Sequence, residues 1–314
     1  MRAYSVFDDV PLEAAAVLGR VDVEATLHPY GVPRPSGETL RELIEAYDIV
    51  LISTAETVTE DMLRGVKTPK ILATASSGTD HIHIPADKAA LIRVANAPTA
   101  NAQSVAEHTF ALLLALEKHL TEARVLAAHG ESKKKMRARP EELAGQTLGV
   151  IGAGHTAAAV LRLGKAFDME TVCWTRYPER HADIVELGVR FAALDELLTK
   201  ADVISLNLPL TEETQGLISR RRIDVMKPGA AFVSTSRPEL IDLPPLLGRA
   251  AREPDFAVGL DIDAGMAYGL WNEASPNVIV TPHIAGGTTQ ARRRLFLEVC
   301  TCIADLVAED VSER

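Results

Sequence analysis

The chain contains the segment Leu148-Gly-Val-Ile-Gly-Ala-Gly-His-Thr-Ala-Ala-Ala-Val-Leu161, and the run Val172-Cys-Trp-Thr-Arg176 follows it. This pattern predicts a short strand, a glycine turn, a helix of small residues and a second strand, the opening βαβ unit of a dinucleotide-binding domain. Gly152 permits the tight turn, Gly154 lets the backbone approach a pyrophosphate, and Ala157 stands where a third glycine is usual. The helix N-terminus adds free N–H groups for the phosphates. The alternative is an ordinary strand-to-helix turn of another α/β protein.

The end of the second strand favours NADP(H) over NAD(H). NAD sites place a carboxylate there, which accepts hydrogen bonds from the ribose 2′-OH, whereas this chain has Thr175. Arg176 follows, and an arginine can bind a 2′-phosphate with two charge-assisted hydrogen bonds. Arg180 and His181 lie near enough in sequence to add positive potential. NAD(H) is the second choice, because Arg176 would also suit a solvated strand end.

Length and composition indicate a globular protein of two domains. The 314 residues exceed one typical core, and 47% are hydrophobic and 24% charged. The net charge of −10 disfavours nucleic acids and anionic membranes as partners. The three cysteines form neither a disulfide framework nor a metal-ligand pattern, and the N-terminus lacks a signal-peptide core. We therefore expect a cytoplasmic protein without a bound metal.

Apolar runs before and after the glycine turn predict α/β structure throughout. The strands that we expect are 3–7, 48–53, 70–74, 92–94, 203–208, 230–234, 257–261 and 278–281, with helices over 102–129 and 288–307 and another beginning after Pro85. Strands that alternate with helices predict parallel, doubly wound sheets that bind ligands at the carboxyl ends of their strands.

Candidate contact residues stand at the carboxyl ends of four of the expected strands. They are Asn207 and Pro209, Thr235 to Arg237, Asp261, and Pro282 with His283. Alone, Arg237 or His283 is as well explained by a structural role. Together, on neighbouring strand ends beside a nicotinamide, they would form an anion clamp and a proton donor.

Several further motifs accompany the glycine turn in order along nearly the whole chain. They include Ser77-Gly-Thr-Asp-His-Ile82, Asn96-Ala-Pro-Thr-Ala-Asn-Ala-Gln-Ser-Val-Ala-Glu-His108, Leu208-Pro-Leu-Thr-Glu-Glu-Thr-Gln-Gly-Leu217, Ser234-Thr-Ser-Arg237 and Val280-Thr-Pro-His-Ile-Ala-Gly286. With these motifs the chain resembles the D-isomer-specific 2-hydroxyacid dehydrogenases. The resemblance implies two Rossmann-like domains with a cleft between them. Residues 1–99 plus 288–314 would form the substrate-binding domain and 100–287 the dinucleotide-binding domain, in a homodimer whose contacts involve the helix beginning near Asn101.

The resemblance also implies an activity, the reduction of a small 2-oxo acid to the D-2-hydroxy acid. Arg237 would bind the substrate carboxylate and polarise the 2-oxo group, and His283 would protonate the oxygen. Backbone N–H groups around Ser77 and Gly78 would bind the other side of the carboxylate, and Asp261 would hold the nicotinamide carboxamide. The cofactor contacts that we expect are Gly152, Gly154, His155, Thr156, Thr175, Arg176, Asn207, Pro209, Thr214, Thr235, Ser236 and Asp261.

The chain departs from the family at the third catalytic residue. The family has a glutamate five positions after the aspartate that matches Asp261, and this chain has Met266. A carboxylate beside an imidazole stabilises its protonated form. Without that glutamate, His283 should therefore lose its proton at a lower pH than the family's histidine does. Asp263, or the more distant Glu273, would have to replace the glutamate.

A second departure is Pro238, where the family has a glycine. Proline biases the backbone of Arg237 towards an extended conformation. These two changes leave a second hypothesis open, a dinucleotide-sensing or protein-interaction relative with impaired catalysis.

Overall fold

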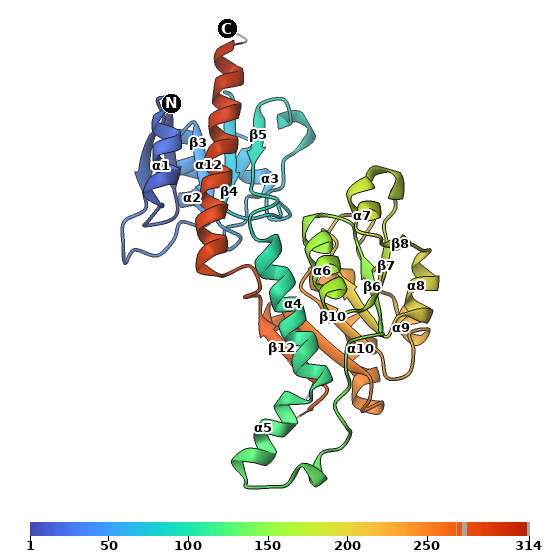
Figure 1. The fold of residues 1–314 in the computed structure, drawn as a ribbon. Helices are drawn as coiled ribbons and strands as arrows, with labels where there is room; N and C mark the ends of the chain where they lie inside the picture. The colour runs from blue at the N-terminus through green and yellow to red at the C-terminus, as the bar shows by residue number, and fades with distance from the viewer. Residues whose placement is uncertain (268, 272–274, 313–314) are drawn as a thin grey trace. The chain divides into compact units, whose positions relative to one another are not determined.

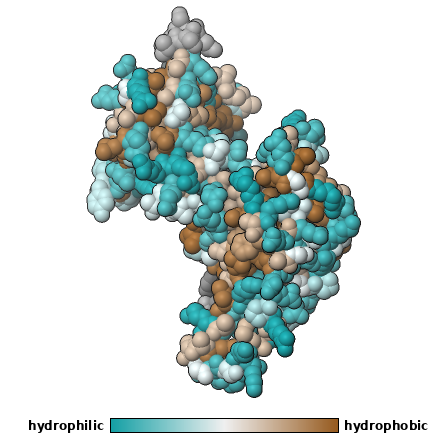
Figure 2. Space-filling model, viewed as in Figure 1, coloured by the Kyte–Doolittle hydropathy of each residue, from teal (hydrophilic) through white to brown (hydrophobic). Residues whose placement is uncertain are grey.

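A computed structural model describes residues 1–267, 269–271 and 275–312, and the chain forms two compact units (Figure 1). Unit 1 comprises Met1–Asn101 with Gly287–Arg314, and unit 2 comprises Ala102–Gly286. Each unit contains a parallel sheet with helices, so the predicted α/β, Rossmann-like fold class is confirmed. Hydrophilic side chains cover much of the face of both units drawn in Figure 2. Among the described residues, no helix is both long and apolar enough to cross a lipid bilayer.

Unit 1 is built on five parallel strands in the order β2-β1-β3-β4-β5. The strands are β1 (Arg2–Ser5), β2 (Glu24–Leu27), β3 (Ile49–Ile52), β4 (Lys70–Thr74) and β5 (Ile92–Ala95). The helices are α1 (Leu12–Gly19), α2 (Gly37–Ala46), α3 (Glu60–Leu63), the 3₁₀ turn η1 (Ala86–Lys88) and α12 (Thr289–Ser312). Every residue of β3 and β4 is buried, as expected of strands with helices on both faces.

The two faces of the unit 1 sheet carry separate hydrophobic clusters. On one face α1 and α12 pack together, and Ala14 and Phe296 are buried there with Ile71 of β4. On the other face, α2 and α3 bury Leu40 and Leu63 against the sheet. The C-terminal helix therefore completes the core of the N-terminal unit, although nearly two hundred residues of unit 2 separate them in sequence.

Unit 2 is built on seven parallel strands in the order β12-β11-β10-β9-β6-β7-β8. The strands are β6 (Thr147–Ile151), β7 (Glu170–Trp174), β8 (Arg190–Phe191), β9 (Val203–Leu206), β10 (Ala231–Ser234), β11 (Ala257–Ile262) and β12 (Val278–Pro282). The α-helices are α4 (Ala102–Glu117), α5 (Leu120–Ala128), α6 (His155–Ala166), α7 (Ala182–Glu186), α8 (Leu194–Lys200), α9 (Arg220–Asp224), α10 (Leu243–Arg252) and α11 (Ala264–Ala267). The 3₁₀ turns are η2 (Lys133–Lys135), η3 (Pro178–Arg180) and η4 (Pro238–Leu240).

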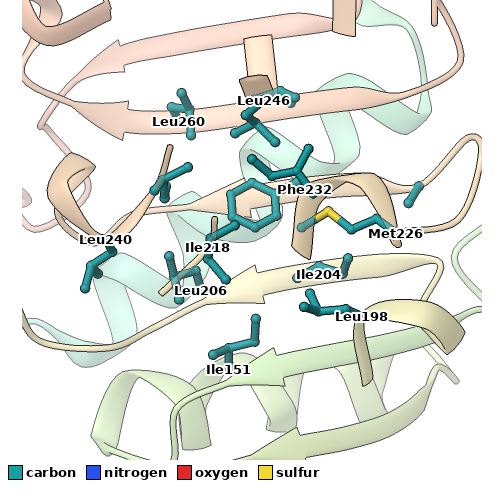
Figure 3. Packing of buried hydrophobic residues seen from close by; sticks show 14 of the residues in the cluster. Ile151, Leu198, Ile204, Leu206, Ile218, Met226, Phe232, Leu240, Leu246 and Leu260 are labelled. Atoms are coloured by element: carbon teal, nitrogen blue, oxygen red, sulfur yellow. The ribbon is translucent and has the colours of Figure 1, made fainter. Parts of the chain in front are cut away.

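Helices cover both faces of this sheet, as its apolar strands require. On one face, α4 and α6 pack on β6, β10 and β11. On the other, Phe232 of β10 packs in one cluster with Ile204 and Leu260 of its neighbouring strands, and Leu246 of α10 lies beside Leu260 (Figure 3). Both faces of the sheet are therefore covered by helices, which leaves the carboxyl ends of the strands as the place for a ligand.

Three local features differ from the sequence expectation. The helical run 102–129 is broken at His119, whose φ of 50° lies in the left-handed region, so it forms α4 and α5. The helix expected after Pro85 is a single 3₁₀ turn. The strands β2 and β8 were not expected, because β2 is an exposed edge strand and β8 has two residues, so neither carries an apolar pattern.

The winding of each sheet creates one switch point, where two neighbouring strands send their chains to opposite sides. It lies between β1 and β3 in unit 1, and between β6 and β9 in unit 2. Ligands of open α/β sheets bind outside the carboxyl ends of the strands at such a point. The unit 2 switch point coincides with the glycine turn.

Candidate active site

The glycine turn after β6 has two glycines with different functions. Gly152 has φ +115°, and a Cβ there would lie 2.2 Å from the Asn207 carbonyl oxygen, so only glycine fits. A Cβ on Gly154, in contrast, would meet no atom of the described residues within 4 Å. Gly154 caps α6, and among the described residues no side chain caps that helix, whose first N–H groups lack a partner within the helix. A phosphate can therefore approach this N-terminus, next to His155 and Thr156.

Asn207 closes the other side of the switch point. Its backbone N–H donates to the Ile151 carbonyl oxygen at 2.8 Å, and its Nδ2 donates to Ser205 Oγ at 2.8 Å. Its Oδ1 is buried and has no hydrogen-bond partner among the described residues. A buried acceptor without a donor costs about 1–3 kcal/mol, so a ligand hydroxyl or amide would satisfy it. The glycine cradle and this oxygen fit a dinucleotide.

The residues expected to bind a 2′-phosphate follow β7. Thr175 is half-buried and Arg176 is exposed. Arg176 forms an ion pair with Glu213, from the loop after β9. The Arg180 guanidinium lies 4.4 Å from the centre of the Tyr177 ring, which holds a second positive charge in this segment.

Three hydroxyls on the list of expected cofactor contacts have protein partners. Thr214 Oγ1 donates to the Pro209 carbonyl oxygen at 2.7 Å, and Ser236 Oγ donates to the Leu206 carbonyl oxygen at 2.9 Å. Thr235 Oγ1 lies 3.4 Å from Thr109 Oγ1 of α4. These bonds fix the loops after β9 and β10, which bound the switch point.

Asp261 is fully buried inside β11 and binds the turn that follows β12. Its Oδ1 accepts hydrogen bonds from Thr281 Oγ1 at 2.6 Å and from the Ile284 N–H at 2.9 Å. Its Oδ2 accepts one from the Ala285 N–H at 2.8 Å. Whatever else it contacts, this carboxylate holds the turn that carries His283.

His283 has a left-handed backbone with φ +53°, which is uncommon for any residue other than glycine. Such conformations persist only where the surroundings hold them, and they cluster at functional sites. Here the N–H groups of the next two residues, Ile284 and Ala285, are bound by Asp261. The His283 side chain is exposed at the carboxyl edge of the sheet.

His108 of α4 joins this network, and sequence reasoning assigned it no function. Its Nε2 lies 2.9 Å from Thr281 Oγ1 and 3.6 Å from Asp261 Oδ1. The sequence signal was its place at the end of the motif Asn96–His108. The motif could not reveal its partners, which lie more than a hundred and fifty residues later.

Arg237 follows β10 and is half-buried. Its φ of −100° and ψ of 138° are extended, as Pro238 predicts, and Pro238 is the first residue of η4. In the order β12-β11-β10, Arg237 and His283 follow the two strands that flank β11. Unit 2 therefore brings an arginine and a histidine to the same sheet edge, on either side of Asp261.

The position of the missing family glutamate lies in α11. Met266 is 46% exposed there. Asp263, one of its possible replacements, accepts a hydrogen bond on Oδ1 from the Gly265 N–H at 2.9 Å. The Asp263 carboxylate thus binds the start of α11, the short helix that follows it. Glu273, the other candidate, lies outside the described residues.

The remaining expected site residues, Ser77 and Gly78, belong to unit 1. They form a turn after β4, in which Ser76 Oγ donates to the Gly78 carbonyl oxygen at 2.6 Å and Asn96 Nδ2 donates to the Ser77 carbonyl oxygen at 2.8 Å. In the described parts of the chain, the backbone N–H groups of Ser77 and Gly78 make no hydrogen bond. A substrate carboxylate could accept hydrogen bonds from both of these N–H groups.

Residues 110–285, from α4 through β12, match the family described as D-isomer specific 2-hydroxyacid dehydrogenase, NAD binding domain. The chain belongs to this family. Hydroxypyruvate reductase of Thermotoga maritima is 32% identical over 316 residues, covering 95% of this chain and 97% of the relative. The match to the NAD-binding domain contains the glycine turn, Arg237 and His283.

Solved structures support the same family over the full length. D-lactate dehydrogenase from Aquifex aeolicus, complexed with NAD and lactic acid, has a TM-score of 0.79 at 28% identity, with 100% of this chain and 97% of that chain covered. The acyclic imino acid reductase Bsp5, in complex with NADPH and D-Arg, has a TM-score of 0.86 at 25% identity, with 98% of each chain covered. This chain is thus an oxidoreductase-family protein with an NAD-binding domain of the Rossmann type.

Proposed function

We propose that the protein reduces a small 2-oxo acid to the D-2-hydroxy acid, with NADP(H) as its preferred cofactor. The observation that supports this most strongly is the pair Arg237 and His283 at strand ends on either side of buried Asp261. A relative that is 32% identical is a hydroxypyruvate reductase. Glyoxylate reductase of Pyrococcus furiosus is 31% identical over 300 residues, covering 92% of this chain and 85% of the relative.

The chemistry divides between two side chains. A bound nicotinamide would supply a hydride to the 2-oxo carbon. Arg237 would bind the substrate carboxylate and draw electron density from the 2-oxo group, because its guanidinium matches a carboxylate fork. His283 would donate a proton to the oxygen as negative charge develops there. Reduction of a carbonyl requires both an oxyanion stabiliser and an acid.

Each unit has a separate task in this proposal. Unit 2 binds the dinucleotide, with the pyrophosphate at Gly154, His155 and Thr156 and the adenosine ribose near Arg176. Unit 1 binds the substrate, with the N–H groups of Ser77 and Gly78 as donors to its carboxylate. We also propose a homodimer formed through the α4 region.

The test is to follow nicotinamide absorbance with NADPH and NADH in the presence of pyruvate, glyoxylate, hydroxypyruvate and bulkier 2-oxo acids. We expect turnover with NADPH, and a loss of about 10²–10⁴ in kcat for Arg237→Gln and for His283→Asn. NADPH affinity should change less than about twofold in both variants, because neither side chain binds the phosphates. Arg190→Gln, at the amino end of β8, is the control. Full activity of either site variant would refute the assignment.

A second candidate function is a dinucleotide sensor of the same family with impaired catalysis. The observation that favours it is Met266, which is 46% exposed where the family has its glutamate. The same experiment separates the two functions. Tight NADPH binding without turnover of any of the 2-oxo acids would support the sensor.

A further inference from the structure

The ion pair between Arg176 and Glu213 joins two loops at the cofactor site. Arg176 follows β7 and Glu213 lies in the loop after β9, and these strands flank β6 in the sheet. The pair therefore joins the segments on either side of the strand that carries the glycine turn. The side chains of Arg176 and Glu213 are 46% and 65% exposed, so both remain accessible to a ligand.

Glu213 is presented by an ordered turn. The Thr211 N–H donates to Thr214 Oγ1 at 2.8 Å, and Thr214 Oγ1 donates to the Pro209 carbonyl oxygen at 2.7 Å. The Gln215 N–H donates to the Thr211 carbonyl oxygen at 3.0 Å. This bonding orders the backbone on both sides of Glu213, the residue whose carboxylate pairs with Arg176.

The charge balance of this segment bears directly on the ribose. An arginine binds a 2′-phosphate best when no other anion competes for its guanidinium. A carboxylate at the same place repels the phosphate and accepts hydrogen bonds from a free 2′-OH. NAD sites carry such a carboxylate at the end of the second strand, where this chain has Thr175. Glu213 brings one to Arg176 from a different loop.

We propose that Glu213 is a specificity-determining residue of the cofactor site, whose carboxylate competes with the 2′-phosphate of NADP(H) for Arg176. The inference rests on the proposed dinucleotide site. It assigns to Arg176 the preference for NADP(H) and to Glu213 an opposing preference for NAD(H). The selectivity between NADPH and NADH that is measured for the wild type would then be the net result of these two opposing contributions.

The test is calorimetric binding of NADPH and NADH, without substrate and at one ionic strength. For Glu213→Gln we expect the ratio of the NADH Kd to the NADPH Kd to rise about threefold or more, the size of an exposed ion pair. Glu212→Gln is the matched control, because it removes the same charge from the neighbouring residue, which is exposed. Its ratio should stay within about 1.5-fold of the wild type.

A double variant tests whether Glu213 acts through Arg176. Arg176→Gln should lower the ratio of the NADH Kd to the NADPH Kd. Adding Glu213→Gln to Arg176→Gln should raise this ratio by a smaller factor than Glu213→Gln does in the wild type. An unchanged ratio in Glu213→Gln, an equal rise in Glu212→Gln, or an undiminished gain without Arg176 would each overturn the inference.

The outcome is separable from the proposed NADP(H) preference. If the wild type binds NADH more tightly but Glu213→Gln raises the ratio, the preference is wrong and the inference stands. If the wild type prefers NADPH and Glu213→Gln changes nothing, the inference is wrong and the preference stands. Failure to bind either dinucleotide would refute both.

Discussion

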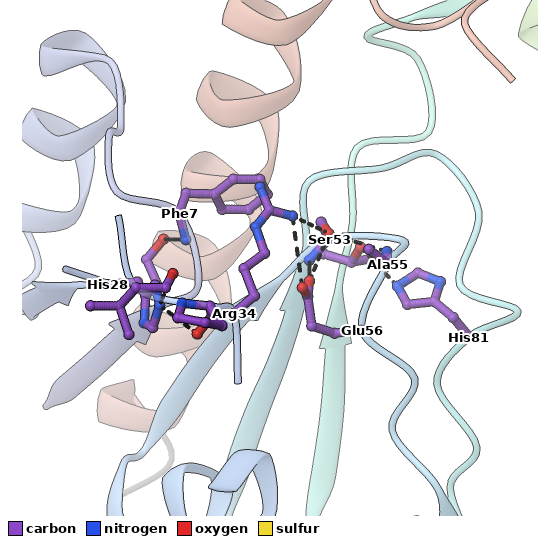
Figure 4. A network of polar contacts seen from close by, with 11 residues as sticks. Phe7, His28, Arg34, Ser53, Ala55, Glu56 and His81 are labelled. Atoms are coloured by element: carbon purple, nitrogen blue, oxygen red, sulfur yellow. Dashed lines mark hydrogen bonds and ion pairs between the residues drawn. The ribbon is translucent and has the colours of Figure 1, made fainter. Parts of the chain in front are cut away.

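At the switch point of unit 1, the chain's own side chains occupy the space between the ends of β1 and β3. The Arg34 guanidinium lies 5.1 Å from the centre of the Phe7 ring and donates to Ser53 Oγ at 2.9 Å (Figure 4). Glu56 is buried beside them and accepts hydrogen bonds from the Ser53 N–H and Oγ at 2.8 and 2.6 Å. The side chains of Arg34, Ser53 and Glu56 thus bond to one another within the unit.

The switch point of unit 2 has the same winding but different side chains. Gly154 leaves open space at the start of α6, and Asn207 Oδ1 is buried without a partner among the described residues. The comparison teaches that winding alone does not select the dinucleotide site. The two points differ in their side chains: those of unit 1 bond to one another, whereas at unit 2 the buried Asn207 Oδ1 has no donor among the described residues.

The largest effect should follow from Gly152→Ala. A Cβ there would overlap the Asn207 carbonyl oxygen, and φ +115° is strained for alanine. We expect a loss of about 2–5 kcal/mol in the free energy of unfolding, together with loss of dinucleotide binding. Urea denaturation and calorimetric titration would measure the two effects.

Gly154→Ala is the matched control for that change. Its Cβ would meet no atom of the described part of the chain within 4 Å, so the free energy of unfolding should change by less than about 1 kcal/mol. NADPH affinity should nevertheless fall about tenfold, because the methyl group takes space that a pyrophosphate needs. A Gly152→Ala protein with wild-type stability and affinity would remove the basis of the comparison.

The next effect concerns Asp261, which holds the His283 turn. Asp261→Ala leaves the N–H groups of Ile284 and Ala285 without their acceptor, at a cost of about 2–4 kcal/mol in stability. Misplacement of His283 should lower kcat about 100-fold. Denaturation and steady-state kinetics would measure these losses.

Asp263→Ala tests the specificity of that effect, because the Asp263 carboxylate binds the Gly265 N–H at the start of α11. We expect its stability to change by less than about 1 kcal/mol. Equal losses of kcat in the two variants would argue against Asp261 as the residue that positions His283.

A smaller effect should follow at the filled switch point. Glu56→Gln keeps the size of the buried side chain but removes the acceptor charge beside Ser53 and Arg34. We expect a loss of about 1–2 kcal/mol in stability and no change in dinucleotide affinity. A clear fall in NADPH affinity would show that unit 1 contributes to the cofactor site.

The smallest effect is the reactivity of the thiols. Burial raises the pKa of Cys173, whose Sγ donates to the Gly152 carbonyl oxygen, to about 12. It raises the pKa of Cys300, in the unit 1 core, to about 11. Thiolates react and thiols do not, so at about pH 8 both should resist Ellman's reagent while half-exposed Cys302 reacts. Reactivity of the buried thiols should rise with pH towards their pKa values. Rapid labelling of all three in the folded protein would contradict this.

Much of the fold could be predicted because the apolar runs of central strands such as β3 and β9 are local signals. The glycine turn was recognisable for the same reason, since strand, turn and helix adjoin in sequence. The extended backbone of Arg237 followed from Pro238, its direct neighbour.

Features that depend on strand order could not be predicted in this way. Glu213 reaches Arg176 because β7 and β9 flank β6, and His108 reaches Thr281 because α4 packs near β12. The internal filling of the unit 1 switch point by Arg34 also depends on partners from separate loops. Long-range contacts of this kind leave no periodic trace in sequence.

The measurement that tests the central claim most directly is amide hydrogen exchange with and without saturating NADPH. If the dinucleotide binds at the unit 2 switch point, exchange over residues 152–158 should slow about tenfold or more, because a phosphate would bind the N–H groups at the start of α6 within this segment. The segments 6–9 and 53–56 of unit 1 should keep their exchange rates. Unchanged exchange over 152–158, with protection at the unit 1 switch point instead, would contradict the account.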